Sequence, residues 1–188
     1  MHIFSITYFF CFISILSCEL KFRKEVKKNN IFFAVEGSKR SGDLYSLEAL
    51  ANGACKVVTS KVTKNKKYLV VRNVKNFLIE ACSAKYKEKP NNIIAVTGTN
   101  GKSSVANFYY QILRNLKIPS AAIGTLGIFY NNKFKKTNLT TPDIITIHKE
   151  LNFLKKNICH SQFLQVFVKI TVKYYTINNS VTTVYFGF

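Results

Sequence analysis

Short apolar runs alternate with stretches of helical periodicity through most of the chain. Continuous apolar runs predict buried strands at Ile31–Val35, Cys55–Thr59, Tyr68–Val71, Ile93–Val96 and Ser120–Gly124. Apolar residues at helical spacing predict helices at Leu44–Asn52, Val74–Tyr86, Val105–Leu116 and Ile144–Lys156. Asn131-Asn132, flanked by apolar residues, predicts a β-hairpin. Strands that alternate with helices in this way predict an α/β fold, although the order of the strands cannot be deduced.

Polar stretches divide this pattern into parts. Lys87–Asn92, which includes Pro90, interrupts the periodicity and predicts a domain boundary. We expect four segments: an apolar N-terminal segment at 1–20, a small α/β domain at 21–89, the first part of a second domain at 90–157, and a strand-prone tail at 158–188. The apolar stretch 3–16 leaves four interpretations open, namely a signal peptide, a membrane span, a buried strand and a misassigned start.

The most specific pattern follows the strand predicted at Ile93–Val96. The stretch 97–104 is Thr-Gly-Thr-Asn-Gly-Lys-Ser-Ser, and it leads directly into a predicted helix. A strand, a glycine turn, a Lys-Ser pair and a helix are the parts of a phosphate-binding loop. Glycines let backbone N–H groups approach a phosphate, and the helix N-terminus adds partial positive charge. The lysine can then reach the β/γ-phosphates, and the serine hydroxyl can bind Mg²⁺.

The spacing of this loop is shorter than usual. Only two residues separate Gly98 from Gly101, whereas the common loop is G-x-x-x-x-G-K-[ST]. The alternatives are a shortened nucleotide loop and an ordinary strand–turn–helix. A lysine in the first turn of a helix is unfavourable against the helix dipole, so a bound anion is its natural partner. The pattern therefore favours a nucleotide loop, and because its ligand would be cytosolic ATP, we expect a cytoplasmic protein without a membrane partner.

Two further segments offer places for anionic groups. The loop 36–42 contains two glycines around a basic pair, which indicates either an anion cradle or a solvated turn. Farther along, Thr141 is a suitable N-cap and Pro142 a suitable first helical residue. Thr140 and Thr141 would then contact a ligand or simply cap the helix, and the residues alone favour neither interpretation.

Composition and charge narrow the classes of partner. The chain of 188 residues carries 28 Lys and Arg against 9 Asp and Glu, a net charge of +19. Such an excess is typical of proteins that bind nucleic acid. The lysines are scattered among Asn, Ile, Phe and Tyr, which share AT-rich codons, and no base-reading motif occurs. A codon bias explains the charge, so we expect no nucleic-acid partner.

The cysteines and histidines predict no metal cluster. The five cysteines include no C-x-x-C pair, which indicates neither a zinc site nor a disulfide framework. Scattered free thiols are typical of a reducing cytosol. The three histidines have no ligand spacing, and we expect His148 on the surface of its helix.

Taken together, these motifs resemble the Mur ligases, the ATP-dependent amide-bond-forming enzymes of peptidoglycan precursor synthesis. The short loop Thr97–Ser103 looks like their nucleotide-binding signature, which accounts for the unusual spacing. Three other stretches support the resemblance. Phe32–Gly37, followed by Gly42 and Tyr45, resembles the uridine-nucleotide domain of the family. Ile123–Gly127 resembles the strand after the loop helix, and Leu139–Pro142 resembles a segment that contacts the muramoyl substrate. The similarity covers residues 26–157.

The resemblance implies a small N-terminal α/β UDP-binding domain followed by an incomplete P-loop-type central ATPase domain. The best match is the branch that adds a third amino acid, diaminopimelate or lysine, to UDP-N-acetylmuramoyl-L-alanyl-D-glutamate. In that reaction ATP phosphorylates the substrate carboxylate, and the amine then displaces phosphate. We expect a monomer that uses ATP and Mg²⁺.

The resemblance also assigns roles to individual residues. The residues implied for ATP are Gly98, Thr99, Asn100, Gly101, Lys102, Ser103 and Ser104. Among these, Lys102 would be catalytic and Ser103 would bind Mg²⁺. The residues implied for the UDP-muramoyl substrate are Ser38, Lys39, Arg40, Thr140 and Thr141.

Several features of the family are missing from the sequence. Ser41 stands where the family has Asp, and residues 158–188 contain no Glu-x-Ser-Ser-His segment and no match to the later metal-binding Lys or the C-terminal domain. We therefore expect a truncated ligase without full activity, in which a frameshift after about Asn157 produced the tail. Two alternatives stay open: a non-catalytic remnant that binds a nucleotide or UDP-sugar, and a membrane-tethered basic protein.

Overall fold

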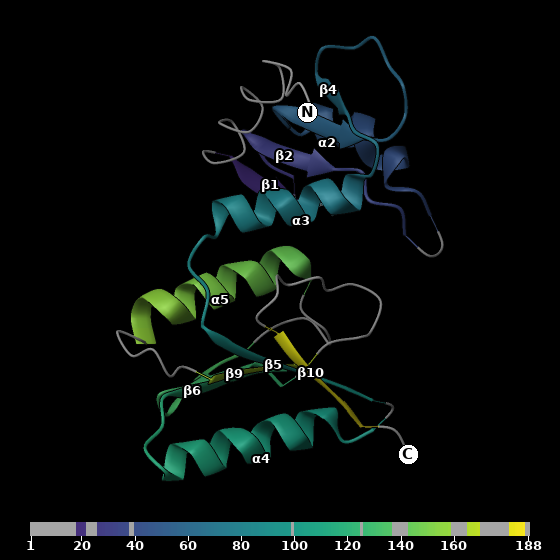
Figure 1. Cartoon of the computed structure of the whole chain (residues 1–188). Coiled ribbons are helices and arrows are strands. Elements are labelled where there is room, and N and C mark those ends of the chain that lie inside the picture. Colours follow the sequence, from purple (N-terminus) through teal and green to yellow (C-terminus); the bar gives the residue numbers. More distant parts are fainter. Residues whose placement is uncertain are drawn as a thin grey trace, which may run out of the picture. The chain divides into compact units, whose positions relative to one another are not determined.

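The structure is a computed structural model, and it describes residues 18–21, 26–37, 40–98, 100–124, 126–136, 143–158, 165–169 and 181–186. The chain divides into two compact units, Met1–Lys85 and Tyr86–Phe188. Each unit combines helices with a sheet of largely parallel strands (Figure 1). The predicted α/β fold is therefore confirmed. The apolar stretch 3–16 lies outside the described residues.

The first unit is built on a sheet of four parallel strands in the order β1-β2-β3-β4. The strands are β1 (Glu19–Lys21), β2 (Asn30–Phe33), β3 (Lys56–Thr59) and β4 (Tyr68–Val70). Its helical elements are the 3₁₀ turn η1 (Gly42–Tyr45), α2 (Ser46–Ala51) and α3 (Val74–Lys85). Strand β1 was not predicted, because three residues beside a basic stretch are too short a pattern to indicate a strand.

Successive side chains of β2 pack on opposite faces of this sheet, as the pleat requires. Phe32 packs in a cluster with Ala49 and Val57. Phe33 contacts Phe77 of α3, with ring centroids 6.3 Å apart. All four residues of β2 are buried, which explains why its sequence is a continuous apolar run rather than an alternating one.

The second unit has a six-stranded sheet in the order β10-β5-β9-β6-β7-β8. Its strands are β5 (Asn92–Gly98), β6 (Ser120–Ile123), β7 (Ile128–Tyr130), β8 (Lys133–Lys135), β9 (Gln165–Lys169) and β10 (Val181–Phe186). Its helices are α4 (Lys102–Asn115) and α5 (Ile144–Ile158). Strand β5 pairs in parallel with β9 on one side and β10 on the other, so it occupies the interior of the sheet.

The two helices of this unit cover opposite faces of its sheet (Figure 1). On one face, Ile147 and Leu151 of α5 pack with Ile93 and Ile123. On the other face, three residues of α4 pack in a cluster with Val96. The three residues are Ala106, Tyr110 and Leu113. Strand β5 therefore contributes to both cores, and α4, which follows β5 directly, is held firmly against the sheet.

The predicted hairpin is confirmed. Strands β7 and β8 pair in antiparallel register, with Tyr130 opposite Lys133. Asn131 and Asn132 have φ values of 42° and 58°, the left-handed conformation that two-residue hairpin turns require and that Asn tolerates well.

Two details of α5 differ from the prediction. Asp143, rather than Thr141, caps the helix, because its carboxylate accepts a hydrogen bond from the Thr146 N–H at 2.9 Å. His148 is buried rather than on the surface, with an exposed fraction of 1%. Helical periodicity does not reveal which residues outside the main apolar stripe will be covered. Among the described residues, no helix is long and apolar enough to cross a membrane.

Candidate phosphate-binding site

The phosphate-loop motif lies between β5 and α4. The strand ends at Gly98, and the helix begins at Lys102 with Gly101 as its N-cap residue. Gly101 has a φ of 75°, and a Cβ there would meet no atom within 4 Å. The requirement for glycine therefore comes from the left-handed backbone rather than from crowding. This turn directs the chain from the sheet interior straight into the first turn of α4.

The first turn of α4 concentrates hydrogen-bond donors. The Val105 N–H donates to the Gly101 carbonyl at 2.9 Å, which closes the first helical turn. The backbone N–H groups before Val105 therefore point out of the helix N-terminus. Gly101 has no side chain with which to cap this end, and the first turn of α4 contains no acidic residue. Lys102 and Ser103 are half-buried and Ser104 is exposed, so an ammonium group, two hydroxyls and backbone N–H groups share one helix end.

A small hollow lies beside Ser103. It is formed by α4, the end of β6 and the turn that follows, and its lining residues are Ser103, Ala106, Asn107, Ala122, Ile123, Gly124, Leu126, Gly127 and Phe129. The turn is closed by two backbone hydrogen bonds between Gly124 and Gly127, at 2.9 and 3.2 Å. The Ile123–Gly127 stretch, which the sequence singled out separately, thus lies next to the phosphate loop.

The second set of predicted contacts lies in the first unit. Arg40 is exposed, and its carbonyl accepts a hydrogen bond from the Gly37 N–H at 3.1 Å, which closes the basic loop. Gly42 follows at a close approach, because a Cβ there would lie 2.6 Å from the Val35 carbonyl oxygen. These contacts hold Arg40 and Gly42 close to the end of β2. Ligands of parallel sheets commonly bind at the carboxyl ends of the strands, so this position is suited to a ligand.

Sequence reasoning missed a polar cluster next to this loop. The Asp43 carboxylate accepts a hydrogen bond from Thr59 Oγ1 at 2.6 Å and lies 3.6 Å from Lys61 Nζ. Ser41 Oγ accepts a hydrogen bond from the Asp43 N–H at 3.4 Å and so caps η1. These residues belong to η1, to β3 and to the segments beside them, so no local spacing in the sequence indicated that they meet.

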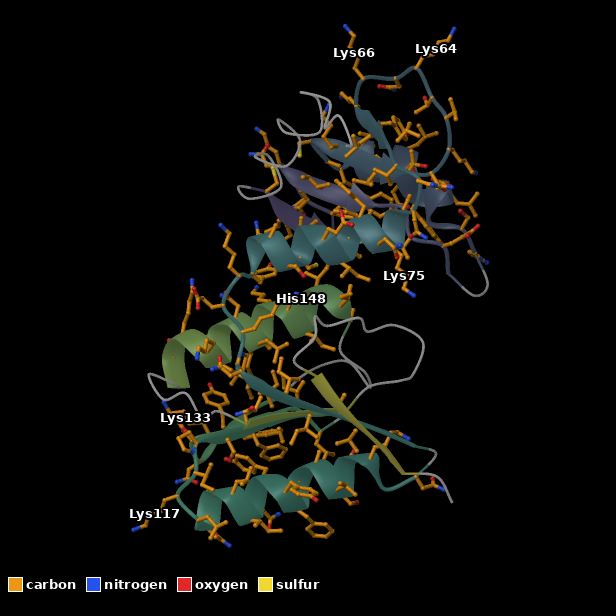
Figure 2. The ribbon with its side chains drawn as sticks, viewed as in Figure 1. Lys64, Lys66, Lys75, Lys117, Lys133 and His148 are labelled. Atoms are coloured by element: carbon orange, nitrogen blue, oxygen red, sulfur yellow. The ribbon has the colours of Figure 1, made fainter. Side chains whose placement is uncertain are left out.

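Other predicted site residues lie outside the described part of the chain, and they are Ser38, Lys39, Thr99, Thr140 and Thr141. Their roles stay predictions, as do those of the described loop residues. Within the described residues, no group of three or more His, Cys, Asp or Glu side chains could hold a metal ion. Of the lysines labelled in Figure 2, Lys64 and Lys66 lie on the loop before β4 and Lys75 lies on α3, whereas Lys117 and Lys133 belong to the second unit.

A region of the chain that includes the loop 97–104 matches a known protein family. Residues 96–164 match the family described as the Mur ligase middle domain. The chain is 37% identical over 131 residues to the UDP-N-acetylmuramoyl-L-alanyl-D-glutamate--2,6-diaminopimelate ligase of Rhizobium meliloti (strain 1021), covering 68% of this chain and 27% of that protein. The ligase of the same name from Rickettsia prowazekii (strain Madrid E) is 40% identical over 132 residues, covering 67% and 28%. The chain thus spans less than a third of these relatives.

Solved structures agree at the level of the fold. A structure of UDP-N-acetylmuramoyl-L-alanyl-D-glutamate--2,6-diaminopimelate ligase matches 81% of this chain and 31% of its own, with a TM-score of 0.64 and 22% identity. The MurF ligase of Thermotoga maritima, solved in complex with ADP, matches 82% of this chain and 33% of its own, with a TM-score of 0.52 and 20% identity. The resemblance found in the sequence is therefore confirmed. About two thirds of this chain is similar in sequence to Mur ligases that are named as 2,6-diaminopimelate ligases.

Proposed function

We propose that the loop 97–104 binds the phosphates of ATP, and that the chain takes part in adding a third amino acid to UDP-N-acetylmuramoyl-L-alanyl-D-glutamate. The observation that carries the proposal is the left-handed Gly101 between an interior strand and α4, with Lys102 and Ser103 directly after it. Relatives named as ligases of this kind, at 37% and 40% identity, support the choice of reaction.

The donor set at this helix end fits a nucleotide triphosphate with Mg²⁺. The Lys102 ammonium would neutralise charge on the phosphoryl group that is transferred. The backbone N–H groups of the first turn would hold the β-phosphate. The Ser103 hydroxyl is a hard oxygen ligand of the kind that Mg²⁺ prefers. When bound, Mg·ATP supplies an activated phosphoryl group for the substrate carboxylate. The contribution of the chain is positioning and charge stabilisation.

The UDP-muramoyl dipeptide is proposed to bind partly at the basic loop of the first unit. Arg40 is exposed there and can pair with a diphosphate, for which guanidinium groups are well suited. Ser38, Lys39, Thr140 and Thr141 complete the proposed set. The incoming amine is proposed to come from diaminopimelate rather than lysine, as the names of the relatives suggest.

Nucleotide binding is tested by titrating the purified chain with a fluorescent ATP analogue and Mg²⁺. Loss of one charge-assisted contact in Lys102→Ala is expected to weaken binding by about tenfold or more. The matched control is Lys133→Ala, which removes an exposed lysine from β8 of the same unit (Figure 2). Equal affinities for the two variants would contradict the proposed role of Lys102.

Substrate binding and turnover are measured separately. Calorimetric titration with the UDP-muramoyl dipeptide is expected to show weaker binding for Arg40→Ala than for Lys64→Ala. Lys64→Ala is the control, because it removes an exposed lysine from the same unit. Release of phosphate in the presence of ATP, the dipeptide and diaminopimelate would establish the ligase reaction for this chain. Binding of both ligands without release would restrict the chain to recognition, and failure to bind either would reject the proposal.

A further inference from the structure

Two cysteines that are distant in the sequence meet in the first unit. The sulfur atoms of Cys18 and Cys55, 37 residues apart, lie 3.6 Å from one another. Both thiols are free and half-buried, so small molecules in solution can reach them. Cys82, the other described cysteine outside any disulfide, is fully buried and provides an internal control.

The sheet brings the two thiols together at one end. Cys18 immediately precedes β1 and Cys55 immediately precedes β3, and both strands pair with β2. The Asn30 carbonyl accepts hydrogen bonds from the Cys55 N–H at 2.9 Å and from its thiol at 3.3 Å. Lys85, at the end of α3, donates to the Cys18 carbonyl at 2.5 Å. Each cysteine therefore has its own hydrogen-bonding partner, Asn30 for Cys55 and the flexible Lys85 side chain for Cys18.

We propose that Cys18 and Cys55 form a redox-active dithiol that closes to an intramolecular disulfide when a small-molecule disulfide is supplied. The bond requires the sulfurs to approach by about 1.5 Å, because an S–S bond is close to 2.05 Å long. Strand β1 can supply this movement, since it lies at the sheet edge and pairs through only three residues. Closure would connect β1 covalently to β3 across the intervening strand.

The reaction proceeds by two exchanges. The Cys18 thiolate attacks a sulfur of the oxidant, for example oxidised glutathione, and one glutathione thiolate leaves. The Cys55 thiol then gives up its proton to solvent, and the resulting thiolate attacks the Cys18 sulfur of the mixed disulfide and displaces the second glutathione as a thiolate. The two cysteines together lose two electrons and two protons, and the oxidant is reduced to two thiols.

The surroundings of Cys55 determine the order of attack. Burial, together with the neighbouring Cys18, raises the pKa of the Cys55 thiol to about 11. At neutral pH Cys55 therefore remains protonated and is a poor first nucleophile. It is suited instead to the second step, in which the attacked sulfur is already within contact distance. Cys18 is accordingly the residue that forms the mixed disulfide.

The test incubates the full chain in buffers of defined reduced and oxidised glutathione, blocks free thiols with acid and an alkylating agent, and maps linked peptides by mass spectrometry. The expected product joins the Cys18 and Cys55 peptides and has lost the mass of two hydrogen atoms. Cys82→Ser should retain this product. Cys18→Ser and Cys55→Ser should lose it, and Cys55→Ser should accumulate glutathione on Cys18.

A comparison with the unfolded chain keeps the test independent of how well the variants fold. The native wild-type chain should form the link faster than the same chain in urea, by about tenfold or more, because the fold holds the sulfurs together. Equal or slower rates in the native state would overturn the proposal. Pairing of Cys18 with Cys82, or only intermolecular links, would overturn it as well.

Discussion

His148 should make the folded chain sensitive to mild acid. Its side chain is 1% exposed, and within the described part of the chain neither ring nitrogen has a hydrogen-bond partner. Burial lowers the pKa of His148 from 6.5 to about 4, and the nearby Lys89 ammonium contributes in the same direction. The folded protein therefore holds this imidazole neutral over a pH range in which the unfolded chain would protonate it.

The sign and size of the effect follow from proton linkage. Between pH 6.5 and 4 the unfolded chain binds a proton at His148 that the folded chain does not, so the free energy of unfolding falls as the pH falls. Above pH 6.5 His148 is neutral in both the folded and the unfolded chain, so it causes no loss of stability there. At about 1.4 kcal/mol per pKa unit, the lowered pKa corresponds to a loss of about 3 kcal/mol by pH 4. A loss of this size is a large part of the stability of a small domain.

Two measurements check this prediction. Proton NMR of the imidazole Cε1–H, assigned by its absence in His148→Phe, should show no titration of His148 between pH 7 and 5. Urea unfolding of wild type and His148→Phe at several pH values should give curves that diverge as the pH falls, with the wild type losing more stability. The difference between the two proteins removes the contribution of carboxylates. Titration of His148 near pH 6.5, or parallel stability curves, would refute the reasoning.

Three further predictions test the local geometry by urea unfolding, two of them with a matched control. Gly101→Ala should cost about 1 kcal/mol through its positive φ and should weaken nucleotide binding, whereas Gly124→Ala, which has open space and no positive φ, should leave stability nearly unchanged. Gly42→Ala should destabilise the first unit by about 1–3 kcal/mol, because its Cβ would lie 2.7 Å from the Ala34 carbonyl carbon; wild-type stability would show that the loop is not packed there. Asp143→Ala should remove the cap of α5 at a cost of about 1 kcal/mol, and Asp143→Ser should recover most of it.

Much of the secondary structure could be predicted from local pattern. Runs of apolar residues, such as Ile31–Phe33 and Ile93–Val96, pack on both faces of their sheets and so contrast clearly with their polar flanks. The Asn131-Asn132 turn is equally local, because two residues with positive φ determine the hairpin. The helix start at 144 was placed closely but assigned to the wrong cap, since Thr141 and Asp143 are both good N-caps and only geometry selects between them.

The sequence alone determined the order of the groups in the loop 97–104, and the proposal that this loop binds phosphate depends on that order. Its glycines, Lys102 and Ser103 are consecutive, so their relation depends on one turn and not on distant contacts. Tertiary structure decided everything that joins remote residues. It placed β5 between β9 and β10, buried His148, and brought Cys18 within 3.6 Å of Cys55. Strand pairing and burial depend on which surfaces meet after the chain folds, and no local spacing in the sequence carries that information.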